Sequence, residues 1–333
     1  MLTDADGGRR TVNPVLAEVT RSGFTESLHR GAVAVLAADG SLLLTGGGAG
    51  LPMYPRSSNK PFQAAAMLRC GLDLDGPLLA LAAASHSGED FHVAGVRKIL
   101  SAAGLTEADL RCPPDQPLDE SEYQAMIRAG MPPDRVHMNC SGKHAAMLAT
   151  CIGAGWPIAS YTDPEHPLQQ QIRTVLTGLA GEPVLTIGVD GCGAPLFAIS
   201  VLGLARAFRA MVLAPAGSPE RRVADAMRSH PEWTSGTTRP ERALMAAVPG
   251  LLLKSGAEGV AGFALADGRA GAFKLDDGTA RGRVPVTVAL LRRLGAEAEP
   301  GADTAALSDL ATTPVTGGGA VVGEVRATRR LSE

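Results

Sequence analysis

The sequence predicts an α+β fold, with an antiparallel sheet that takes its strands from both ends of the chain. Short runs rich in β-forming residues lie in about 14–50 and again in about 250–325, where Asp-Gly pairs mark tight turns. The middle of the chain, about 60–248, carries apolar residues mostly at helical spacing. We therefore expect the terminal strands to form one sheet with helices packed around it, in a single unit spanning residues 1–333.

The same pattern sets the bounds of the predicted elements. Strands are expected at 14–20, 32–36, 42–45, 183–189, 251–254, 260–266, 271–275 and 320–325. Helices are expected at 61–70, 77–83, 91–103, 145–152, 196–211, 219–229, 239–247 and 284–294. The stretch 111–133 is rich in proline and acidic residues, so we expect loops around one short helix there.

Composition restricts the class of partner. The formal net charge is −3 and 45% of the residues are hydrophobic, which indicates a globular protein without a nucleic-acid or membrane surface. No apolar run approaches membrane-spanning length, and residues 1–7 lack the basic and apolar regions of a signal peptide. Five cysteines, an odd number, favour reduced thiols or metal ligands. We expect a cytoplasmic protein that acts on a small molecule.

Lysine is rare in this chain, so its positions are informative. Of 31 basic residues, 26 are arginine and five are lysine, namely Lys60, Lys98, Lys143, Lys254 and Lys274. Lysine can lose its proton when it is buried, whereas arginine cannot. Codon bias is the alternative explanation, but three of the five lysines stand in motif-like contexts.

The first such context is Ser57-Ser58-Asn59-Lys60, which has the spacing S-x-x-K. A lysine one helical turn after a serine can act as its base if the amine is neutral. Pro61 is tolerated only in the first turn of a helix, so it places Ser57 at a helix entrance. The macrodipole there favours a developing oxyanion.

The second context is Lys254-Ser255-Gly256, which ends an apolar strand. Together with S-x-x-K, a Lys-Ser-Gly strand is typical of serine β-lactamases and penicillin-binding proteins. Its lysine charge would help to keep Lys60 neutral. The third motif of that group, Ser-x-Asn or Tyr-x-Asn, is not recognisable, so a penicillin-recognising enzyme fits poorly. A lysine beside a glycine turn is the alternative interpretation.

The third context combines cysteines with a lysine. Cys140 and Lys143 precede a helix, and Cys192 follows a predicted strand in a glycine turn. Two thiolates from separate loops can bind a metal, for which Zn²⁺ is the usual choice, with His144 and Asp190 next to it. Two alternatives stay open, namely buried structural thiols and a cysteine hydrolase with Cys140 as nucleophile and His144 as base.

At this point five segments match, in order, the rhizobial-type L-asparaginases, also called class 3 or the asparaginase II family. The resemblance covers about residues 14–325, and the run from Asn139 to His144 is its most specific part. The segments are Arg56-Ser57-Ser58-Asn59-Lys60-Pro61, Ala84-Ser85-His86-Ser87, Asn139-Cys140-Ser141-Gly142-Lys143-His144, Asp190-Gly191-Cys192 and Lys254-Ser255-Gly256-Ala257. Taken alone, the polar cluster 84–90 that contains the second segment favours only a capped helix start.

The resemblance implies a serine-β-lactamase-like fold, a homodimer, and hydrolysis of L-asparagine to L-aspartate and ammonia. It implies two Ser-Lys pairs, Ser57 with Lys60 and Ser85 with Lys254, with Ser57 as the nucleophile. It implies zinc ligands at Cys140, Lys143 and Cys192. The residues expected next to the substrate and metal are Arg56, His144 and Asp190.

The expected mechanism makes Lys60 the base for Ser57 and gives Ser85 the role of relaying a proton to the leaving ammonia. Zinc is expected to position the substrate carboxylate or amine. Two other functions stay open. One is a different Ser-Lys hydrolase, such as a glutaminase, an esterase or a β-lactamase relative. The other is a non-catalytic protein with a structural zinc or redox site.

Overall fold

The structure is a computed structural model that describes residues 12–332. The stretch 1–7, which was considered as a leader, lies outside the described residues. The strands are β1 (Val15–Arg21), β2 (Phe24–Leu36), β3 (Leu42–Gly46), β4 (Pro52–Met53), β5 (Ile187–Val189), β6 (Pro195–Phe197), β7 (Ile199–Ser200), β8 (Leu252–Gly256), β9 (Val260–Ala264), β10 (Ala270–Leu275), β11 (Thr312–Gly317) and β12 (Ala320–Ala327).

Twelve α-helices are present in this range. They are α1 (Lys60–Arg69), α2 (Gly76–Ala82), α3 (Asp90–Ala102), α4 (Glu120–Arg128), α5 (Ser141–Ala154), α6 (Pro167–Ala180), α7 (Val201–Leu213), α8 (Pro219–Ser229), α9 (Pro231–Thr234), α10 (Pro240–Ala247), α11 (Arg283–Arg293) and α12 (Thr304–Leu310). None of the helices in residues 12–332 combines the length and apolarity needed to span a bilayer.

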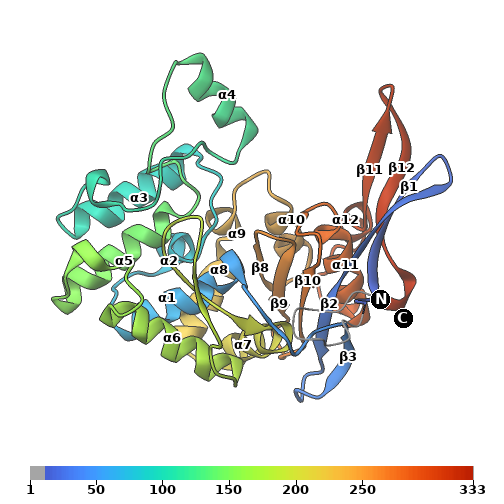
Figure 1. Cartoon of the computed structure of the whole chain (residues 1–333), viewed down its shortest axis with the longest axis horizontal. Helices are drawn as coiled ribbons and strands as arrows, with labels where there is room; N and C mark the ends of the chain where they lie inside the picture. Colours follow the sequence, from blue (N-terminus) through green and yellow to red (C-terminus); the bar gives the residue numbers. More distant parts are fainter. Residues whose placement is uncertain (1–11, 333) are drawn as a thin grey trace, which may run out of the picture.

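The main sheet joins strands from the two ends of the chain. Its order is β11-β12-β1-β2-β10-β9-β8, and β3 adds to β2. Every pairing is antiparallel. The predicted α+β class, with one antiparallel sheet and helices around it, is therefore confirmed, as Figure 1 illustrates.

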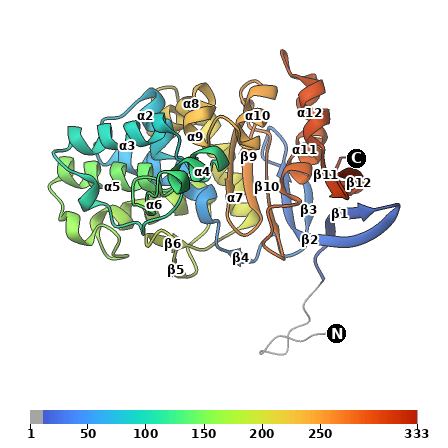
Figure 2. The ribbon, with the colours of Figure 1, turned by 90° about the horizontal axis from the view of Figure 1, so that it is seen from above.

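The sheet is buried on both faces in its centre. In β2, Ala32, Ala34 and Leu36 face the core shared with the helical middle, whereas Val33 and Val35 face the opposite core. This alternation is the period of two that a strand imposes. Helix α7 packs on one face against β2, β9 and β10, and α11 packs on the other face, which Figure 2 makes visible from above.

The contact between α7 and the sheet requires a glycine. A Cβ atom added to Gly262 of β9 would lie 2.4 Å from the Phe208 ring of α7. Phe208 in turn meets Phe62 of α1 edge to face, with ring centroids 5.3 Å apart. Gly262 thus allows α7, and through it the start of α1, to pack closely against the sheet.

Two predicted elements are wrong in detail. The expected buried strand 183–189 is reduced to β5, whose Val189 is 79% exposed. The expected helix 196–211 begins later, at Val201, because residues 195–200 form the short strands β6 and β7 against β5 and β4. Ser200 then caps α7 by accepting a hydrogen bond from the Gly203 N–H, at 2.9 Å.

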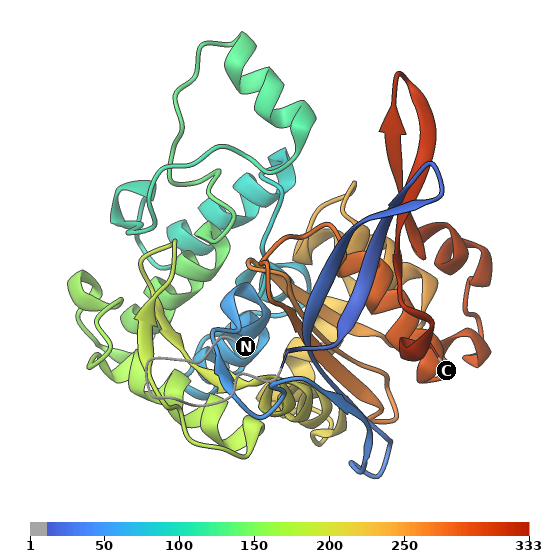
Figure 3. The ribbon, with the colours of Figure 1, turned by 45° about the vertical axis from the view of Figure 1, so that its right-hand side comes forward.

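One β-hairpin and one segment that contains a helix extend from the body of the molecule. The β11–β12 hairpin rises from the edge of the sheet, and α4 lies on a long excursion of the chain on the opposite side (Figure 3). The short helix predicted within 111–133 corresponds to α4, which Asp119 caps by accepting from Ser121 N–H and Glu122 N–H.

Gly262→Ala is expected to lower the free energy of unfolding by about 1–3 kcal/mol, because the new methyl group must displace the Phe208 ring. Urea denaturation followed by circular dichroism measures the change. Gly153→Ala in α5 is the matched control, since an added Cβ there meets nothing within 4 Å. That variant is expected to be neutral or to gain about 0.5–1 kcal/mol. Equal losses in the two variants would contradict the packing role of Gly262.

Candidate active site

The predicted serine turn lies where α1 begins. Residues Arg56–Asn59 form one 3-10 turn that leads directly into α1, with Pro61 in the first turn of the helix. Arg56 has a φ of 51°, which is unusual for a residue with a side chain. The helix start predicted from Pro61 is therefore present, and a 3-10 turn that contains Ser57 precedes the α-helix.

Strand β8 packs tightly against this turn. A Cβ added to Gly256 would lie 2.6 Å from the Pro55 carbonyl oxygen and 3.1 Å from the Ser58 nitrogen. Only glycine permits this approach without a shift in the backbone. The Lys-Ser-Gly segment therefore lies beside the S-x-x-K segment, although about two hundred residues separate them in the chain.

Two lysines meet at one serine hydroxyl. Lys60 Nζ lies 3.0 Å from Ser85 Oγ and donates to the Ala84 carbonyl oxygen at 2.6 Å. Lys254 Nζ lies 2.9 Å from the same Ser85 Oγ and donates to the Ser255 carbonyl oxygen at 2.8 Å. Ser85 is therefore the shared neighbour of both lysines.

Both lysine side chains are almost completely buried, with Lys60 1% and Lys254 3% exposed. Burial lowers the pKa of Lys254 well below its ordinary value, and the positive charge of Lys60 lowers it further. Two ammonium groups on one hydroxyl repel each other in a region with little water. The arrangement favours a state in which Lys254 is a neutral amine.

Ser57 has a different environment from Ser85. Its side chain is partly buried, and within residues 12–332 its Oγ makes no hydrogen bond. The adjacent Ser58 is committed locally, because its N–H and its hydroxyl both donate to the Pro55 carbonyl oxygen. Lys60 and Ser57 are joined in the described residues by a backbone hydrogen bond, from the Lys60 N–H to the Ser57 carbonyl oxygen, whereas the Lys60 amine bonds to Ala84 and Ser85.

An ion pair connects the serine turn to the cysteine loop. Arg56 Nε donates to Asp190 Oδ1 at 2.8 Å, and its Nη1 lies 3.8 Å from a Glu258 carboxylate oxygen. Asp190 Oδ2 lies 3.6 Å from the Cys192 sulfur. The structure therefore brings together Arg56, Asp190 and Cys192, three of the residues that the sequence singles out.

The predicted metal ligands also lie together. Lys143 Nζ is 3.1 Å from Cys192 Sγ, and the Cys140 thiol adjoins the Cys192 sulfur. The Cys140 thiol and the Lys143 charge hold the pKa of Cys192 far below its ordinary value despite burial. Of the two thiols, Cys192 therefore loses its proton more readily, because the Cys192 sulfur and burial raise the pKa of Cys140.

These donors fit the chemistry of a zinc site once Lys143 is a neutral amine. Burial lowers the pKa of Lys143, but the surrounding negative charges, that of Cys192 first, together outweigh burial and raise it above its ordinary value, so zinc must displace the Lys143 proton to bind there. A tetrahedral Zn²⁺ with ordinary Zn–S and Zn–N distances places two donors about 3.6 Å apart, so Lys143 and Cys192 need to separate by about half an ångström. Within residues 12–332, no three His, Cys, Asp or Glu side chains are grouped as a metal site. The predicted zinc site therefore has three ligands only if Lys143 is one of them, beside Cys140 and Cys192.

His144 lies behind the cysteines. Its side chain is fully buried, and its Nδ1 is 2.6 Å from the Tyr161 hydroxyl. Its Nε2 has no hydrogen-bond partner of good geometry within residues 12–332, although the Cys192 sulfur is a close neighbour. Burial lowers the pKa of His144, so the ring is neutral and its free nitrogen faces the cysteine group.

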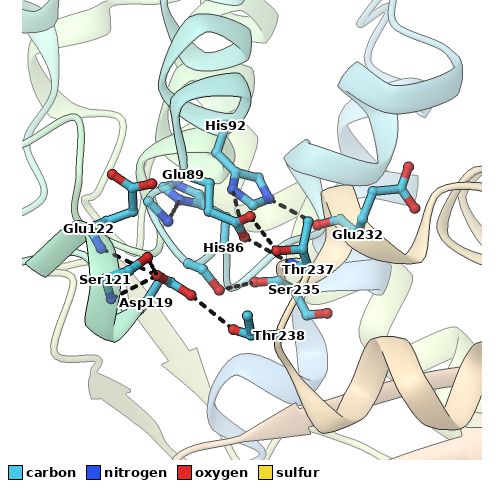
Figure 4. Close-up of polar contacts among 12 residues, drawn as sticks. His86, Glu89, His92, Asp119, Ser121, Glu122, Glu232, Ser235, Thr237 and Thr238 are labelled. Carbon is cyan, nitrogen blue, oxygen red and sulfur yellow. Dashed lines mark hydrogen bonds and ion pairs between the residues drawn. The ribbon is translucent and has the colours of Figure 1, made fainter.

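The loop after Ser85 is held by a second network, drawn in Figure 4. Ser87 Oγ donates to the Ser235 carbonyl oxygen at 2.7 Å, and Glu89 accepts from the Thr237 N–H and hydroxyl. Asp119 accepts from the Thr238 hydroxyl at 2.9 Å. The sequence favours a capped helix start at 84–90, but Glu89 makes no cap bond to α3 and instead fastens the segment 235–238.

His86 joins the Ser85 loop to the start of α5. The Ser141 hydroxyl donates to the Val136 carbonyl oxygen at 2.7 Å, so it accepts from His86 Nε2–H at 2.8 Å. His86 Nδ1 accepts from the Gly88 N–H. Burial holds the pKa of His86 well below its ordinary value, so the ring is neutral in this network.

These networks were missed in the sequence because their members lie far apart along it. Glu89 and Thr237 are 148 residues apart, and Asp119 and Thr238 are 119 apart. No spacing rule connects such residues, whereas S-x-x-K is a local pattern. In the sequence, only the polar character of the cluster 84–90 indicates that this loop forms hydrogen bonds with other segments.

Comparison with known proteins identifies the class and then the family. A family model described as L-asparaginase II matches residues 17–327, which places the protein among the amidohydrolases. More narrowly, the chain belongs to the L-asparaginase II family, as the sequence motifs predict. A comparison with curated proteins finds no match.

Solved structures give more distant similarities. Mglu in its native form is 16% identical, with a TM-score of 0.40 over 77% of this chain and 63% of that chain. The chain thus spans less than two thirds of the Mglu chain that it matches. A β-lactamase from Burkholderia vietnamiensis is 12% identical, with a TM-score of 0.34 over 85% of this chain and 91% of that chain. Similarity at this level carries no argument about activity.

We expect one Zn²⁺ per chain in the purified wild-type protein, and loss of that zinc in Cys192→Ala, which lacks the thiolate donor. Mass spectrometry of the metal content measures both. Cys151→Ala is the matched control, because Cys151 is a buried thiol of the same helix as Lys143 and burial raises its pKa to about 11. Zinc retained in Cys192→Ala, or absent from the wild type, would contradict the site.

Proposed function

We propose that the protein hydrolyses L-asparagine to L-aspartate and ammonia. The observation that carries the proposal is the placement of the Ser85 hydroxyl between two buried lysine amines, in a chain of the L-asparaginase II family. A serine and a neutral amine in contact are the elements of covalent catalysis on an amide.

Proton transfer runs through Ser85 in this proposal. Lys60 passes a proton through Ser85 Oγ to the neutral Lys254, along contacts of 3.0 and 2.9 Å. Lys60 then has a neutral amine and takes the proton of Ser57 as Ser57 attacks the side-chain amide carbon. The neutral amine thus lies first on Lys254, whereas the sequence expectation places it on Lys60.

The second half of the reaction uses the same groups. The proton stored on Lys254 returns through Ser85 to the leaving nitrogen, so that ammonia departs. Water then hydrolyses the aspartyl ester on Ser57 and restores the serine. No proton is gained or lost by the two lysines over the complete cycle.

Arg56 and Asp190 are the proposed groups for the ends of the substrate. The half-buried Arg56 guanidinium, next to Ser57, suits the α-carboxylate, and Asp190 suits the α-ammonium group. His144 is fully buried, so we assign it to the support of Cys192 rather than to contact with the substrate. A Zn²⁺ held by Cys140, Lys143 and Cys192 would supply positive charge for a substrate carboxylate or bind its amine.

Ammonia release from purified protein tests the proposal. The wild type is expected to release ammonia from L-asparagine faster than from L-glutamine. Ser57→Ala is expected to lose about 10³-fold or more in kcat, and Ser85→Ala about 10²–10⁴-fold. Ser101→Ala, on the exposed side of α3, is the control and keeps wild-type rates.

Several outcomes would change the assignment. Full activity of Ser57→Ala with an inactive Ser85→Ala would make Ser85 the nucleophile. Preference for L-glutamine would make the enzyme a glutaminase, and release from neither amide would overturn the proposal. The homodimer and the cytoplasmic location stay predictions, of which light scattering tests the first.

The rate is also expected to depend on pH with a defined sign. Activity needs a neutral Lys254, so kcat/KM falls as pH drops through the lowered pKa of that lysine. Lys254→Arg, which keeps the charge at every pH, is expected to lose about 10²–10⁴-fold. Lys98→Arg, an exposed lysine of α3, is the control with an unchanged profile. A profile that rises toward acid would contradict the role of Lys254.

A further inference from the structure

A buried carboxylate lies on the back of β8, away from the reacting serines. Glu241, in the first turn of α10, is 5% exposed. The Ser255 hydroxyl donates to it, and Arg283 Nη2 of α11 donates to the same oxygen at 3.1 Å. An acidic side chain is rarely buried without such partners. Nothing in the proposed reaction uses Glu241 directly, so its presence needs an explanation.

The partners of Glu241 are the residues that hold Lys254. Ser255, which donates to Glu241, also offers its carbonyl oxygen to Lys254 Nζ at 2.8 Å. Arg283 donates through Nη1 to the Gly256 carbonyl oxygen at 3.2 Å. Gly256 is the residue that packs against the serine turn. Glu241 and Arg283 thus fix the two residues that follow Lys254 and the direction in which its amine points.

Glu241 also supplies a negative charge to the groups that act on Lys254. Lys60, Arg283 and Arg239 disfavour the Lys254 ammonium, whereas Glu241 favours it. Arg239 Nε lies 3.7 Å from Glu241 Oε2. Although burial opposes ionisation, Arg283 and Arg239 hold the pKa of Glu241 below its ordinary value, so it is a carboxylate.

Within residues 12–332, the charged side chains on the other elements packed on β8 have partners of their own. Strand β9 has no charged residue, and Arg56 on the serine turn is paired with Asp190. From α8, Arg228 reaches the Gly250 carbonyl oxygen, which precedes Lys254 by four residues. The charge balance at Lys254 is therefore determined by Lys60 on one side and by the Glu241 group on the other.

We propose that Glu241 is a positioning residue for Lys254: from the back of β8 it fixes the Lys254-Ser255-Gly256 segment and offsets the positive charges around the Lys254 amine. The inference rests on the proposed function, in which Lys254 must be neutral to accept a proton. It assigns a role to a residue that lies outside both Ser-Lys pairs and outside the cysteine group.

Glu241→Gln separates this role from a purely structural one, because glutamine keeps the size of the side chain and loses only the charge. Without that charge the Lys254 ammonium is less favourable, so the acidic limb of the kcat/KM profile is expected to move to lower pH. Glu220→Gln is the matched control. Glu220 is also 5% exposed and paired with an arginine, Arg69 at 2.7 Å, but it lies on α8 outside the site.

Arg283→Gln provides the opposite test. Removal of this positive charge makes the Lys254 ammonium more favourable. The acidic limb of the kcat/KM profile is therefore expected to move to higher pH. Loss of stability lowers activity in both variants and cannot move the limb in opposite directions. Arg283→Gln also keeps the inference testable if Glu241→Gln fails to fold.

A second measurement does not depend on turnover. With five lysines in the chain, carbon-13 labelling at lysine Cε gives few resonances, and Lys254→Arg assigns the one that belongs to Lys254. Its titration midpoint is expected to fall in Glu241→Gln and to stay unchanged in Glu220→Gln. If the wild type releases no ammonia, the proposed function is wrong, but the Lys254 titration still tests the role of Glu241. An unchanged Lys254 midpoint in folded Glu241→Gln would overturn the inference.

Discussion

The contact of two buried lysines with one serine hydroxyl is the constraint around which the other features of the site are arranged. Lys60 and Lys254 both lie within 3.0 Å of Ser85 Oγ, and each also has a backbone carbonyl partner. Carbonyl partners reduce the cost of burying an amine, but they do not remove the repulsion between two ammonium groups. Burial, and next the charge of Lys60, lowers the pKa of Lys254, so Lys254 loses its proton more readily than an exposed lysine does.

This contact depends on close packing of three distant segments. Lys60 comes from α1, Ser85 from the loop after α2 and Lys254 from β8. Gly256 allows β8 to approach the serine turn, and Gly262 allows α7 to hold Phe62 of α1 through Phe208. Two glycines thus transmit the geometry of the sheet to the lysines. A methyl group at either position would alter the distance on which proton transfer depends.

The serine and cysteine parts of the site form one connected structure. Arg56, next to Ser57, pairs with Asp190, which lies beside Cys192. On the other side, His86 follows Ser85 and binds Ser141 at the start of α5, one residue after Cys140. Polar contacts therefore connect the cysteine group to the segments that carry both serines. This connection gives a physical reason for the proposed zinc site to lie beside the proposed Ser-Lys site.

The sequence by itself determined the α+β class and the family, and it supplied the candidate site residues. It did so because strand and helix periods are local, and because S-x-x-K, Lys-Ser-Gly and Asn-Cys-Ser-Gly-Lys-His are continuous motifs. Only the tertiary structure decided that the Lys60 amine bonds to the Ser85 hydroxyl, and that Glu241 bonds to Ser255, the residue after Lys254. It also replaced the first residues of the expected helix 196–211 by two short strands, so that α7 begins at Val201. Burial and pairing across the fold decide these points, and such long-range contacts leave no periodic trace in the sequence.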